Sequence, residues 1–361
     1  MDCRLDQLTE WVSQQVETRT TPVVLEVVSG DASFRRYFRL RAEEDTKDLI
    51  AVDAPPPQED CKSFVSVARA LLEAGVEVPE VFAVDYEQGF MLLSDLGDDL
   101  LLDCLSRSDV EALNVEELTV EALYQKALGC LAQIMSCKAP VPSYSGLKLQ
   151  DEMSLFPDWF LQEYLGVAVE PQVLRPAFDL LAESALEQPQ VFVHRDYHSR
   201  NLMITPRQTL GVIDFQDAVV GPITYDIVSL LRDCYVAWPL SRVESWVEES
   251  RQYLQQKGLV NPSVTQSQFM KWFDLMGAQR HLKAIGIFAR LNCRDAKPGY
   301  LLDIPRTLRY LLDVCDEYDA LSDLAGEIRQ RILPALFEKN KQASQWFQKA
   351  HYVDIDLNLT G

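Results

Sequence analysis

Apolar and polar residues follow two different patterns along the chain, and these predict a strand-rich first part and a mostly helical remainder. Short β-branched or aromatic runs separated by charged, turn-rich segments are typical of strands. The predicted strands are residues 23–28, 36–40, 48–52, 80–85 and 90–93. We expect the first three to form an antiparallel meander. A helix is expected over residues 58–75, where Phe64, Val67 and Leu71 recur at helical spacing and Gly75 marks the end.

Beyond residue 97 the periodicity is mainly helical, with one compact β segment at residues 191–215. The predicted helices are residues 120–137, 158–165, 171–186, 224–238, 266–291 and, with breaks, 306–337. The pattern therefore predicts an α+β, two-lobed fold with a small antiparallel β-rich N-lobe (1–96) and a larger, mainly helical C-lobe (97–361). The lobe boundary is expected at residues 94–97, and ligands favour the cleft between such lobes.

The first 17 residues predict an acidic amphipathic helix with Leu5, Leu8, Trp11 and Val12 on one face, and they lack the apolar core of a signal peptide. No apolar run reaches the roughly 20 residues that span a bilayer. The eight cysteines are scattered without a C-x-x-C pair, which favours reduced, mostly buried thiols. We therefore expect a cytoplasmic protein.

Charge narrows the function classes further. The 361 residues carry a formal net charge of −21 at pH 7, which repels nucleic-acid phosphates and anionic lipid surfaces. We expect no nucleic acid and no membrane among its partners, and no obligate protein partner is evident. A chain of this length can bury a large core without disulfides or a structural metal.

The most informative stretch begins at an apolar strand that delivers His194, Arg195 and Asp196. Asn201 lies five positions after Asp196, and a hairpin with its turn near residues 205–208 returns the chain to Asp214. This is the spacing of a kinase catalytic loop and of the metal-binding Asp that follows it. Phosphoryl transfer needs a carboxylate that accepts the hydroxyl proton and oxygen ligands for Mg²⁺. The hairpin is expected to bring Asp196, Asn201 and Asp214 around one point.

Two neighbouring residues have roles that support this loop. His194 is interpreted as a structural brace of the loop. Asp226 begins an apolar helix, where its charge favours the helix dipole. An equally good interpretation is that Asp226 tethers the catalytic-loop backbone.

A second motif lies between the first two predicted strands. Its small residues would let backbone N–H groups approach nucleotide phosphates. The candidate nucleotide-binding residues here are Gly30, Asp31, Ala32, Ser33 and Arg35. Taken alone this segment is more typical of a plain hairpin turn, but the catalytic loop downstream favours nucleotide binding.

These motifs together resemble a known family. The pattern VHRDYHSRNLM, VIDFQD and GPITYD is similar to that of the aminoglycoside phosphotransferase/choline kinase family, over nearly the whole chain. The resemblance implies a protein-kinase-like fold and the cofactors ATP and Mg²⁺. It implies that Asp196 is the catalytic base and that Asn201 and Asp214 hold Mg²⁺. It also implies a hinge at Leu93, Asp95 and Leu96 that meets adenine through the backbone.

The segments SGDASFRRYFRL, VDAPPP and GAQRHLKAIGIFARL further resemble bacterial sugar kinases of this family. Those enzymes phosphorylate the C1 hydroxyl of N-acetylmuramate and N-acetylglucosamine in peptidoglycan recycling, so the resemblance implies a small-molecule amino sugar as substrate. N-acetylmuramate carries a carboxylate, which calls for an arginine. The candidate substrate-binding residues are Gln216, Asp217, Arg280 and His281.

Other functions stay open at this point. An aminoglycoside or choline-like acceptor is one alternative, and a catalytically silent, nucleotide-binding regulator is another. A protein kinase is disfavoured because no activation segment ending in A-P-E is recognisable.

The sequence departs from the kinase pattern in two places. The third predicted strand carries no lysine for the nucleotide phosphates, so another cation must neutralise them or the metal must do more. Arg35, Arg36 and Lys62 are the candidates. The triplet at Asp214 reads Asp-Phe-Gln, which argues against an activation switch at a glycine.

Overall fold

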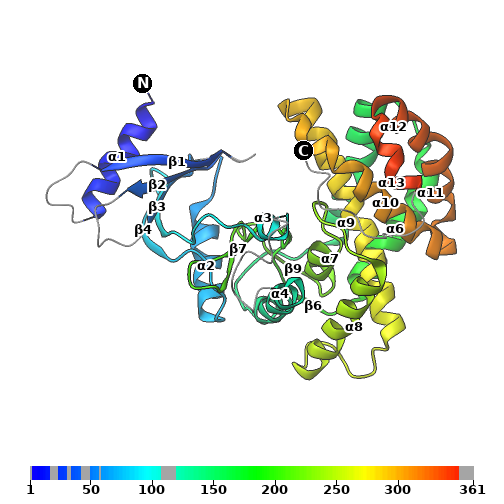
Figure 1. Ribbon diagram of the computed structural model, residues 1–361, viewed down its shortest axis with the longest axis horizontal. Coiled ribbons are helices and arrows are strands. Elements are labelled where there is room, and N and C mark those ends of the chain that lie inside the picture. The colour runs from blue at the N-terminus through cyan, green and yellow to red at the C-terminus, as the bar shows by residue number, and fades with distance from the viewer. Residues whose placement is uncertain are drawn as a thin grey trace. The chain divides into compact units, whose positions relative to one another are not determined.

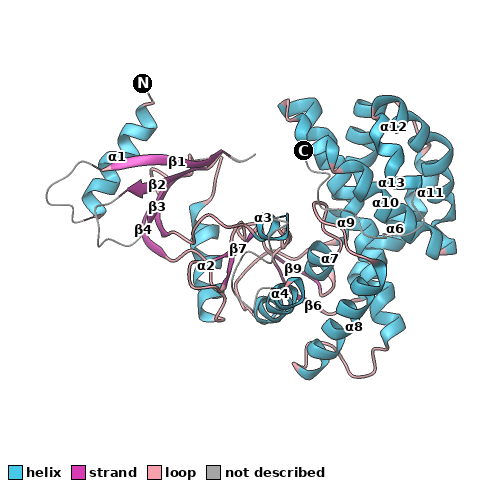
Figure 2. Cartoon of the chain, viewed as in Figure 1, coloured by secondary structure: helices cyan, strands magenta, loops and turns pink. Residues whose placement is uncertain are grey.

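The computed structural model describes residues 2–16, 23–30, 34–41, 49–56, 58–106 and 119–348. The chain divides into two compact units, each assembled from separate segments. The first comprises Met1–Leu101, Ser136–Pro140 and Arg200–Ala218, and the second comprises Leu102–Met135, Val141–Ser199 and Val219–Gly361. Most strands belong to the first unit, whereas the second is almost wholly helical (Figure 2). The predicted lobes 1–96 and 97–361 stay a prediction.

A five-stranded antiparallel sheet forms the body of the first unit. Its strands are β1 (Val24–Gly30), β2 (Arg36–Arg41), β3 (Leu49–Asp53), β4 (Val81–Asp85) and β5 (Phe90–Ser94). Their order is β1-β2-β3-β5-β4, so the predicted meander of the first three strands is confirmed. A separate hairpin, β7 (Leu202–Ile204) and β8 (Leu210–Val212), belongs to the same unit and confirms the predicted turn.

The predicted N-terminal helix is α1 (Cys3–Gln15), which packs on one face of this sheet (Figure 1). The Asp2 side chain caps it by accepting a hydrogen bond from the Leu5 N–H. Leu8, Trp11 and Val12 are buried against alternate residues of β2, β3 and β5. Each such side chain contributes about 1.5–3 kcal/mol by leaving water, so the helix is an integral part of the unit.

Two further helices complete the first part of the chain. Helix α2 (Cys61–Glu73) begins where Asp60 accepts hydrogen bonds from the N–H groups of the first turn. It ends before Gly75, whose φ of +83° is the left-handed conformation that favours glycine. This confirms the predicted helix and its end. The short helix α3 (Leu101–Ser106) was not predicted.

The second unit is a helical assembly around one long, largely buried helix, α9 (Gln266–Asp295). The other helices are α4 (Val120–Met135), α5 (Gly146–Leu155), α6 (Pro171–Glu187), α7 (Tyr225–Leu231), α8 (Leu240–Gln256), α10 (Ile304–Glu317), α11 (Ser322–Glu327), α12 (Leu333–Lys339) and α13 (Gln345–Gln348). Short 3₁₀ segments are η2 (Pro298–Leu302), η3 (Asp319–Leu321) and η5 (Lys341–Ser344), and π-helical segments are η1 (Phe156–Leu165) and η4 (Ile328–Ile332). Strands β6 (Gln190–Val193) and β9 (Val219–Pro222) form a small antiparallel pair.

Helix α9 packs closely against the junction of α5 and η1, and one glycine makes this possible. A Cβ atom at Gly286 would lie 2.4 Å from the carbonyl carbon of Leu155. Any other residue would force the two backbones apart, so glycine is required at this crossing.

Several sequence predictions differ from the structure in this unit. The helix predicted over 224–238 is only Tyr225–Leu231, because the chain turns at Asp233, whose carboxylate accepts the backbone N–H groups of Ser199 and Tyr235. Helices α5 and α8 and strand β9 were not predicted. The segment predicted as helix 158–165 lies within the π-helical η1.

Two findings concern the expectations about thiols and membranes. All eight cysteines are free thiols; Cys3 and Cys293 are exposed, and Cys130 and Cys137 are half-buried. Among the described residues, no helix has the length and apolar character needed to cross a bilayer.

Candidate active site

The loop that follows β6 is held by a carboxylate from α7. The Asp226 side chain accepts the backbone N–H groups of His194, at 2.6 Å, and Arg195, at 3.0 Å. The interpretation of Asp226 as a tether of the loop is therefore confirmed. Its side chain is buried, and burial raises its pKa to about 6.

The tethered backbone is strained at Arg195, whose φ of +79° is left-handed. Such a conformation costs a non-glycine residue about 1–3 kcal/mol and persists where neighbouring contacts hold it. His194 braces the loop as expected: it is fully buried, and its Nδ1 accepts the Asp196 N–H at 3.2 Å. The next residue, Tyr197, anchors the loop to α4 through a hydrogen bond from its hydroxyl to the Ala127 carbonyl, at 2.8 Å.

Asp196 itself lies among cations. Removal from water raises the pKa of this carboxyl, but Lys283, Arg195 and Arg280 lower it by more, so the pKa falls to about 2. The carboxylate is therefore ionised throughout the neutral pH range. An ionised carboxylate can orient a substrate hydroxyl and accept its proton during transfer.

Lys283 was not predicted to belong to this site. It lies on α9 three residues after Arg280, hence on a neighbouring part of the same helix face. Its ammonium donates a hydrogen bond to the Tyr225 hydroxyl at 3.0 Å and lies 3.5 Å from a carboxylate oxygen of Glu152. The i, i+3 spacing of Arg280 and Lys283 could have indicated from the sequence that the two residues share one face of this helix.

Glu152, on α5, is the second residue that sequence analysis missed. Its buried carboxylate forms ion pairs with Arg195 and Lys283 and accepts a hydrogen bond from the Tyr144 hydroxyl. Despite burial, which raises the pKa, these cations hold the pKa of Glu152 below its usual value. Glu152 thereby fixes two of the cations that act on Asp196.

The two candidate residues on α9, Arg280 and His281, differ in their surroundings. Arg280 is 5% exposed, its Nη1 lies 3.6 Å from the Cys234 sulfur, and its Nε has no hydrogen-bond partner among the described residues. His281 is fully buried, contacts the Arg232 carbonyl through Nε2 at 3.1 Å and stacks on Tyr310. Burial lowers the pKa of His281 to about 3, so the ring is neutral. These contacts give His281 a packing role, and its predicted contact with a substrate stays a prediction.

Asn201 and Asp214 lie together in the first unit, as predicted. The Asn201 side-chain amide is 3.3 Å from the Asp214 carboxylate, and the Ile213 N–H donates to the Asn201 carbonyl. Asp214 has a left-handed φ of +65°. An Asp and an Asn this close supply the oxygen ligands that Mg²⁺ takes alongside water and phosphates, so the pair fits the ion. The expected convergence of Asp196 with this pair stays a prediction.

Gln216 and Asp217 are placed in the first unit as well. The Gln216 amide donates to Asp214 at 2.7 Å, and its backbone carbonyl accepts the Ser63 hydroxyl at 3.0 Å. Asp217 is exposed. The Gln216 side chain therefore orients Asp214, and its predicted contact with a sugar stays a prediction.

The predicted nucleotide-binding residues are also in the first unit. Gly30 is the last residue of β1 and pairs with Arg36, whereas Asp31, Ala32 and Ser33 lie outside the described residues. Arg35 is 4% exposed and forms an ion pair with Glu59 at 3.1 Å.

The predicted hinge follows β5. Leu93 and Leu96 are buried, and Asp95 accepts the Gly97 N–H at 2.9 Å while forming an ion pair with Arg39. A Cβ atom at Gly211 of β8 would lie 2.9 Å from the Leu96 side chain, so this glycine makes room for the hinge leucine. These contacts define the conformation of the turn, and its predicted role as a nucleotide-binding hinge stays a prediction.

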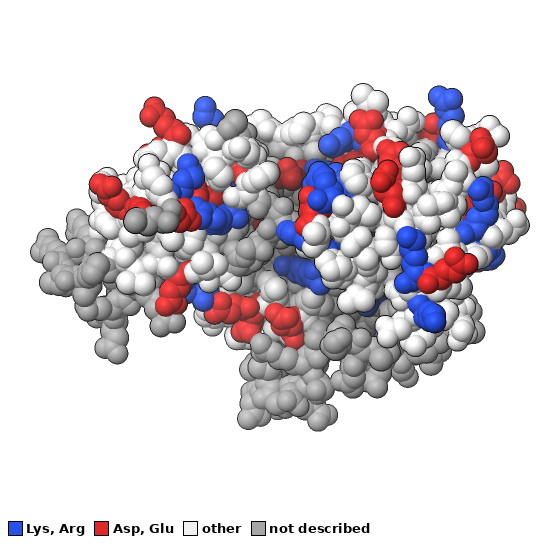
Figure 3. Space-filling view, turned by 90° about the horizontal axis from the view of Figure 1, so that it is seen from above, with Lys and Arg blue, Asp and Glu red and all other residues white. Residues whose placement is uncertain are grey.

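The positively charged side chains near Asp196 differ in sign from the net charge of the chain. On the face drawn in Figure 3, acidic and basic side chains are interspersed, although the chain carries a net charge of −21. The cations Lys283, Arg195 and Arg280, which lower the pKa of Asp196, therefore stand against an overall negative charge.

The chain combines a β-rich unit with a helical unit, and its fold is protein-kinase-like, which confirms the predicted fold class. The catalytic-loop motif and the paired Asn201 and Asp214 are those of a phosphotransferase. The chain belongs to the phosphotransferase enzyme family, whose model matches residues 24–259.

Relatives in sequence and in structure agree with this assignment. The chain is 42% identical over 338 residues to the N-acetylmuramate/N-acetylglucosamine kinase of Pseudomonas aeruginosa, covering 91% of this chain and 96% of that protein. It is 40% identical over 339 residues to the protein of the same name from Pseudomonas putida, with the same coverage. A choline kinase from Streptococcus pneumoniae has a similar fold, with a TM-score of 0.57 at 13% identity, covering 86% of this chain and 100% of that one.

Proposed function

We propose that the protein transfers the γ-phosphoryl group of ATP to the C1 hydroxyl of N-acetylmuramate and N-acetylglucosamine, giving sugar 1-phosphates for the recycling of cell-wall precursors in the cytoplasm. The similarity to kinases named for these two sugars supports the substrate class. The C1 position rests on the sequence resemblance described above.

One structural observation favours this acceptor over the alternatives. Lys283, Arg195 and Arg280 act together on Asp196, and Arg280 is a buried cation whose Nε has no hydrogen-bond partner among the described residues. Buried positive charge repels a polycationic aminoglycoside or a choline-like cation, and it attracts the carboxylate of N-acetylmuramate. An arginine pairs with such a carboxylate best in a bidentate pose.

The chemistry that follows is an in-line displacement. The sugar hydroxyl oxygen forms a bond to the γ-phosphorus, the bond between that phosphorus and the β–γ bridging oxygen breaks, and ADP leaves with the electron pair. Asp196 orients the hydroxyl and accepts its proton. A pKa of about 2 makes Asp196 a weak base, but an anomeric hydroxyl is more acidic than an ordinary alcohol, and a loose transition state needs the proton only late.

The remaining residues have binding roles in this proposal. Asn201 and Asp214 would hold Mg²⁺, which neutralises phosphate charge when bound. The backbone of residues 30–33 and the hinge at Leu93, Asp95 and Leu96 would bind the nucleotide. A silent regulator has no evident need for both the Asn201–Asp214 pair and an ionised Asp196.

The test is an acceptor panel with labelled ATP and Mg²⁺, comprising N-acetylmuramate, N-acetylglucosamine, their 1-O-methyl glycosides, an aminoglycoside and choline. We expect phosphate transfer only to the two sugars with a free C1 hydroxyl. The Asp196→Asn variant should keep its circular dichroism spectrum and lose turnover by at least about 100-fold. Phosphorylation of a methyl glycoside, or of the aminoglycoside instead of the sugars, would refute the proposal.

A further inference from the structure

In the kinase pattern a lysine on the third strand contacts the nucleotide phosphates, but β3 reads Leu-Ile-Ala-Val-Asp, so another cation of the first unit is a candidate for this contact. Phosphoryl transfer depends on positive charge at the phosphates besides the metal ion. The candidates near the end of β1 and the start of α2 are Arg35, Arg36 and Lys62, and the structure distinguishes among them.

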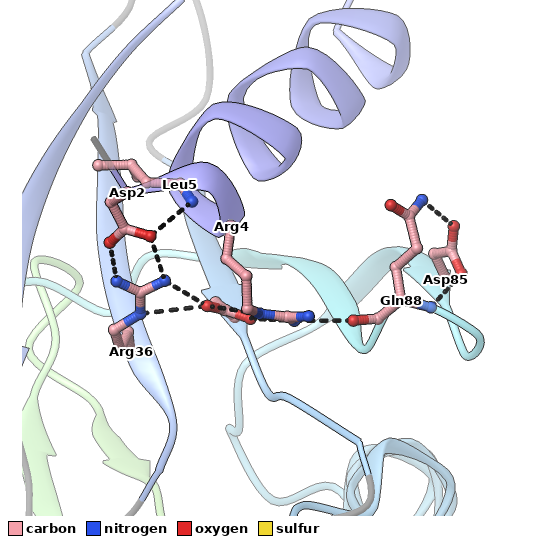
Figure 4. Close-up of polar contacts among 7 residues, drawn as sticks. Asp2, Arg4, Leu5, Arg36, Asp85 and Gln88 are labelled. Atoms are coloured by element: carbon pink, nitrogen blue, oxygen red, sulfur yellow. Dashed lines mark hydrogen bonds and ion pairs between the residues drawn. The ribbon is translucent and has the colours of Figure 1, made fainter.

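Arg36 is committed to a structural cluster. Its guanidinium donates to Asp53 at 2.6 Å and also pairs with Asp2, the residue that caps α1 (Figure 4). Arg4 of α1 binds the same Asp53 from the other side. With two carboxylates already bound, Arg36 holds α1 to the sheet. Lys62 is exposed in the first turn of α2, where its charge is solvated.

Arg35 has different surroundings. Its guanidinium pairs with Glu59 at 3.1 Å and lies over the ring of Phe64, 5.6 Å from the ring centre. The other oxygen of Glu59 accepts the Phe34 N–H at 3.2 Å. Glu59 thus holds both the cation and the backbone beside it, so the guanidinium is oriented before any ligand binds.

The same contacts connect Arg35 to the candidate metal ligand. Phe64 packs on Phe215, the residue after Asp214, with ring centres 4.8 Å apart. The start of α2 also binds this segment directly, because the Ser63 hydroxyl donates to the Gln216 carbonyl and the Gln216 amide donates to Asp214. The start of α2 therefore fixes the cation and the segment that carries Asp214 as one rigid group within the first unit.

We propose that Arg35 binds the phosphates of the nucleotide and that Glu59 is its positioning residue, the pair replacing the absent β3 lysine. This inference rests on the proposed use of ATP, but not on the identity of the acceptor. A guanidinium suits the role because its N–H groups can bind a carboxylate on one edge and phosphate oxygens on another.

The test measures Mg²⁺-dependent binding of ADP, AMP and adenosine by calorimetry to the full chain. For Arg35→Ala we expect ADP affinity to fall by about 10- to 100-fold, the effect of losing a hydrogen bond from a charged donor, with unchanged adenosine affinity. Arg35→Lys should restore part of the loss. Lys62→Ala is the matched control, because it removes an exposed cation from the same region, and it should bind all three ligands normally.

Glu59→Gln tests the positioning role. It should raise the KM for ATP and lower kcat, with an unchanged KM for the acceptor, while leaving the circular dichroism spectrum intact. Equal losses of affinity for adenosine and for ADP in the folded Arg35→Lys variant would assign the Arg35–Glu59 pair a structural role and overturn the proposal. An unchanged ADP affinity in Arg35→Ala would also overturn it. Failure of the acceptor panel alone would refute the sugar kinase and leave the ADP result standing.

Discussion

At the scale of single residues, the catalytic loop shows how a strained backbone is kept in place. Arg195 adopts a left-handed φ of +79°, and its N–H, together with that of His194, is bound by Asp226. A buried carboxylate that accepts two N–H groups offsets such strain. The arrangement has a consequence for stability, because Asp226 has its pKa raised to about 6 by burial.

The first prediction concerns this pKa. In the unfolded chain an Asp titrates near about 4, so between these values the folded state binds the extra proton. The contribution of Asp226 is therefore fully present at low pH and is lost as the pH rises through 6. The free energy of unfolding of the wild type and of Asp226→Asn is measured by urea denaturation at each pH. Between about pH 5 and pH 8, the wild type should lose about 1 kcal/mol of stability relative to the variant. A pH-independent difference would contradict the raised pKa.

The second prediction concerns Arg280. N-acetylmuramate and N-acetylglucosamine differ in a carboxylate-bearing group, so the neutral sugar is an internal control. Arg280→Gln should lower kcat/KM for N-acetylmuramate by about 10- to 100-fold and change that for N-acetylglucosamine far less. Equal losses for both sugars would assign Arg280 to packing or to Asp196 alone. Steady-state kinetics with each sugar gives the comparison.

The sequence predicts some residues of the candidate site and misses others, for a physical reason. Asp196, Asn201 and Asp214 share one loop and hairpin, so their spacing in the sequence carries the signal. Glu152 and Lys283 are brought to the loop by packing of α5 and α9. The spacing of Lys283 from Arg280 indicates only a shared helix face, and no local pattern records the contact of either residue with the loop. The buried ion pairs of Glu152 with Arg195 and Lys283 can therefore be identified only from the folded structure.

At the scale of elements, α1 is joined to the sheet by both apolar packing and charge. Leu8, Trp11 and Val12 fill one face of the sheet, and Asp53, 1% exposed, receives Arg4 from α1 and Arg36 from β2. A carboxylate this deeply buried is costly unless paired. Its two cations therefore make the position of α1 specific.

The third prediction tests this connection. Asp53→Ala leaves the two arginines without their shared partner and should lower the free energy of unfolding by about 2 kcal/mol, less than for a fully buried pair because both arginines are over one-third exposed. Arg4→Ala keeps the Arg36–Asp53 pair and should cost less than about 1 kcal/mol. Chemical denaturation of both variants measures the difference, and an equal cost would contradict a central role for Asp53.

Elements were predicted well where a helix has one apolar face or a strand is a short apolar run bounded by turn or charged residues. This holds for α1, α2 and the strands of the five-stranded sheet, all of which are confirmed. Helix α5 was missed because the charged Glu152 occupies a buried position and interrupts its apolar pattern. The helix predicted at 224–238 was too long because the side chain of Asp233, which stops it, acts through a tertiary contact to Ser199.

At the scale of the whole molecule, the net charge of −21 describes the surface and not the site. Two of the buried cations are held by specific carboxylates within their own units, Lys283 by Glu152 and Arg35 by Glu59. A net negative charge favours repulsion between copies of the chain in solution, while buried cations paired with carboxylates can still present positive charge locally.

The fourth prediction follows from the eight free cysteines. Because no cross-link constrains the unfolded chain, dithiothreitol should leave the thermal midpoint unchanged. Differential scanning fluorimetry with and without the reductant tests this. A lower midpoint under reduction would reveal a disulfide that the structure does not contain.

The exposed thiols have a practical consequence. Cys3 belongs to the first unit and Cys293 to the second, and both are exposed, whereas the other six are buried or half-buried. Maleimide dyes should attach to these two positions first. A donor dye on one of these native thiols and an acceptor dye on the other would report the separation of the two units by energy transfer. The measurement could be made with and without the proposed nucleotide and sugar ligands, and it needs no engineered residue.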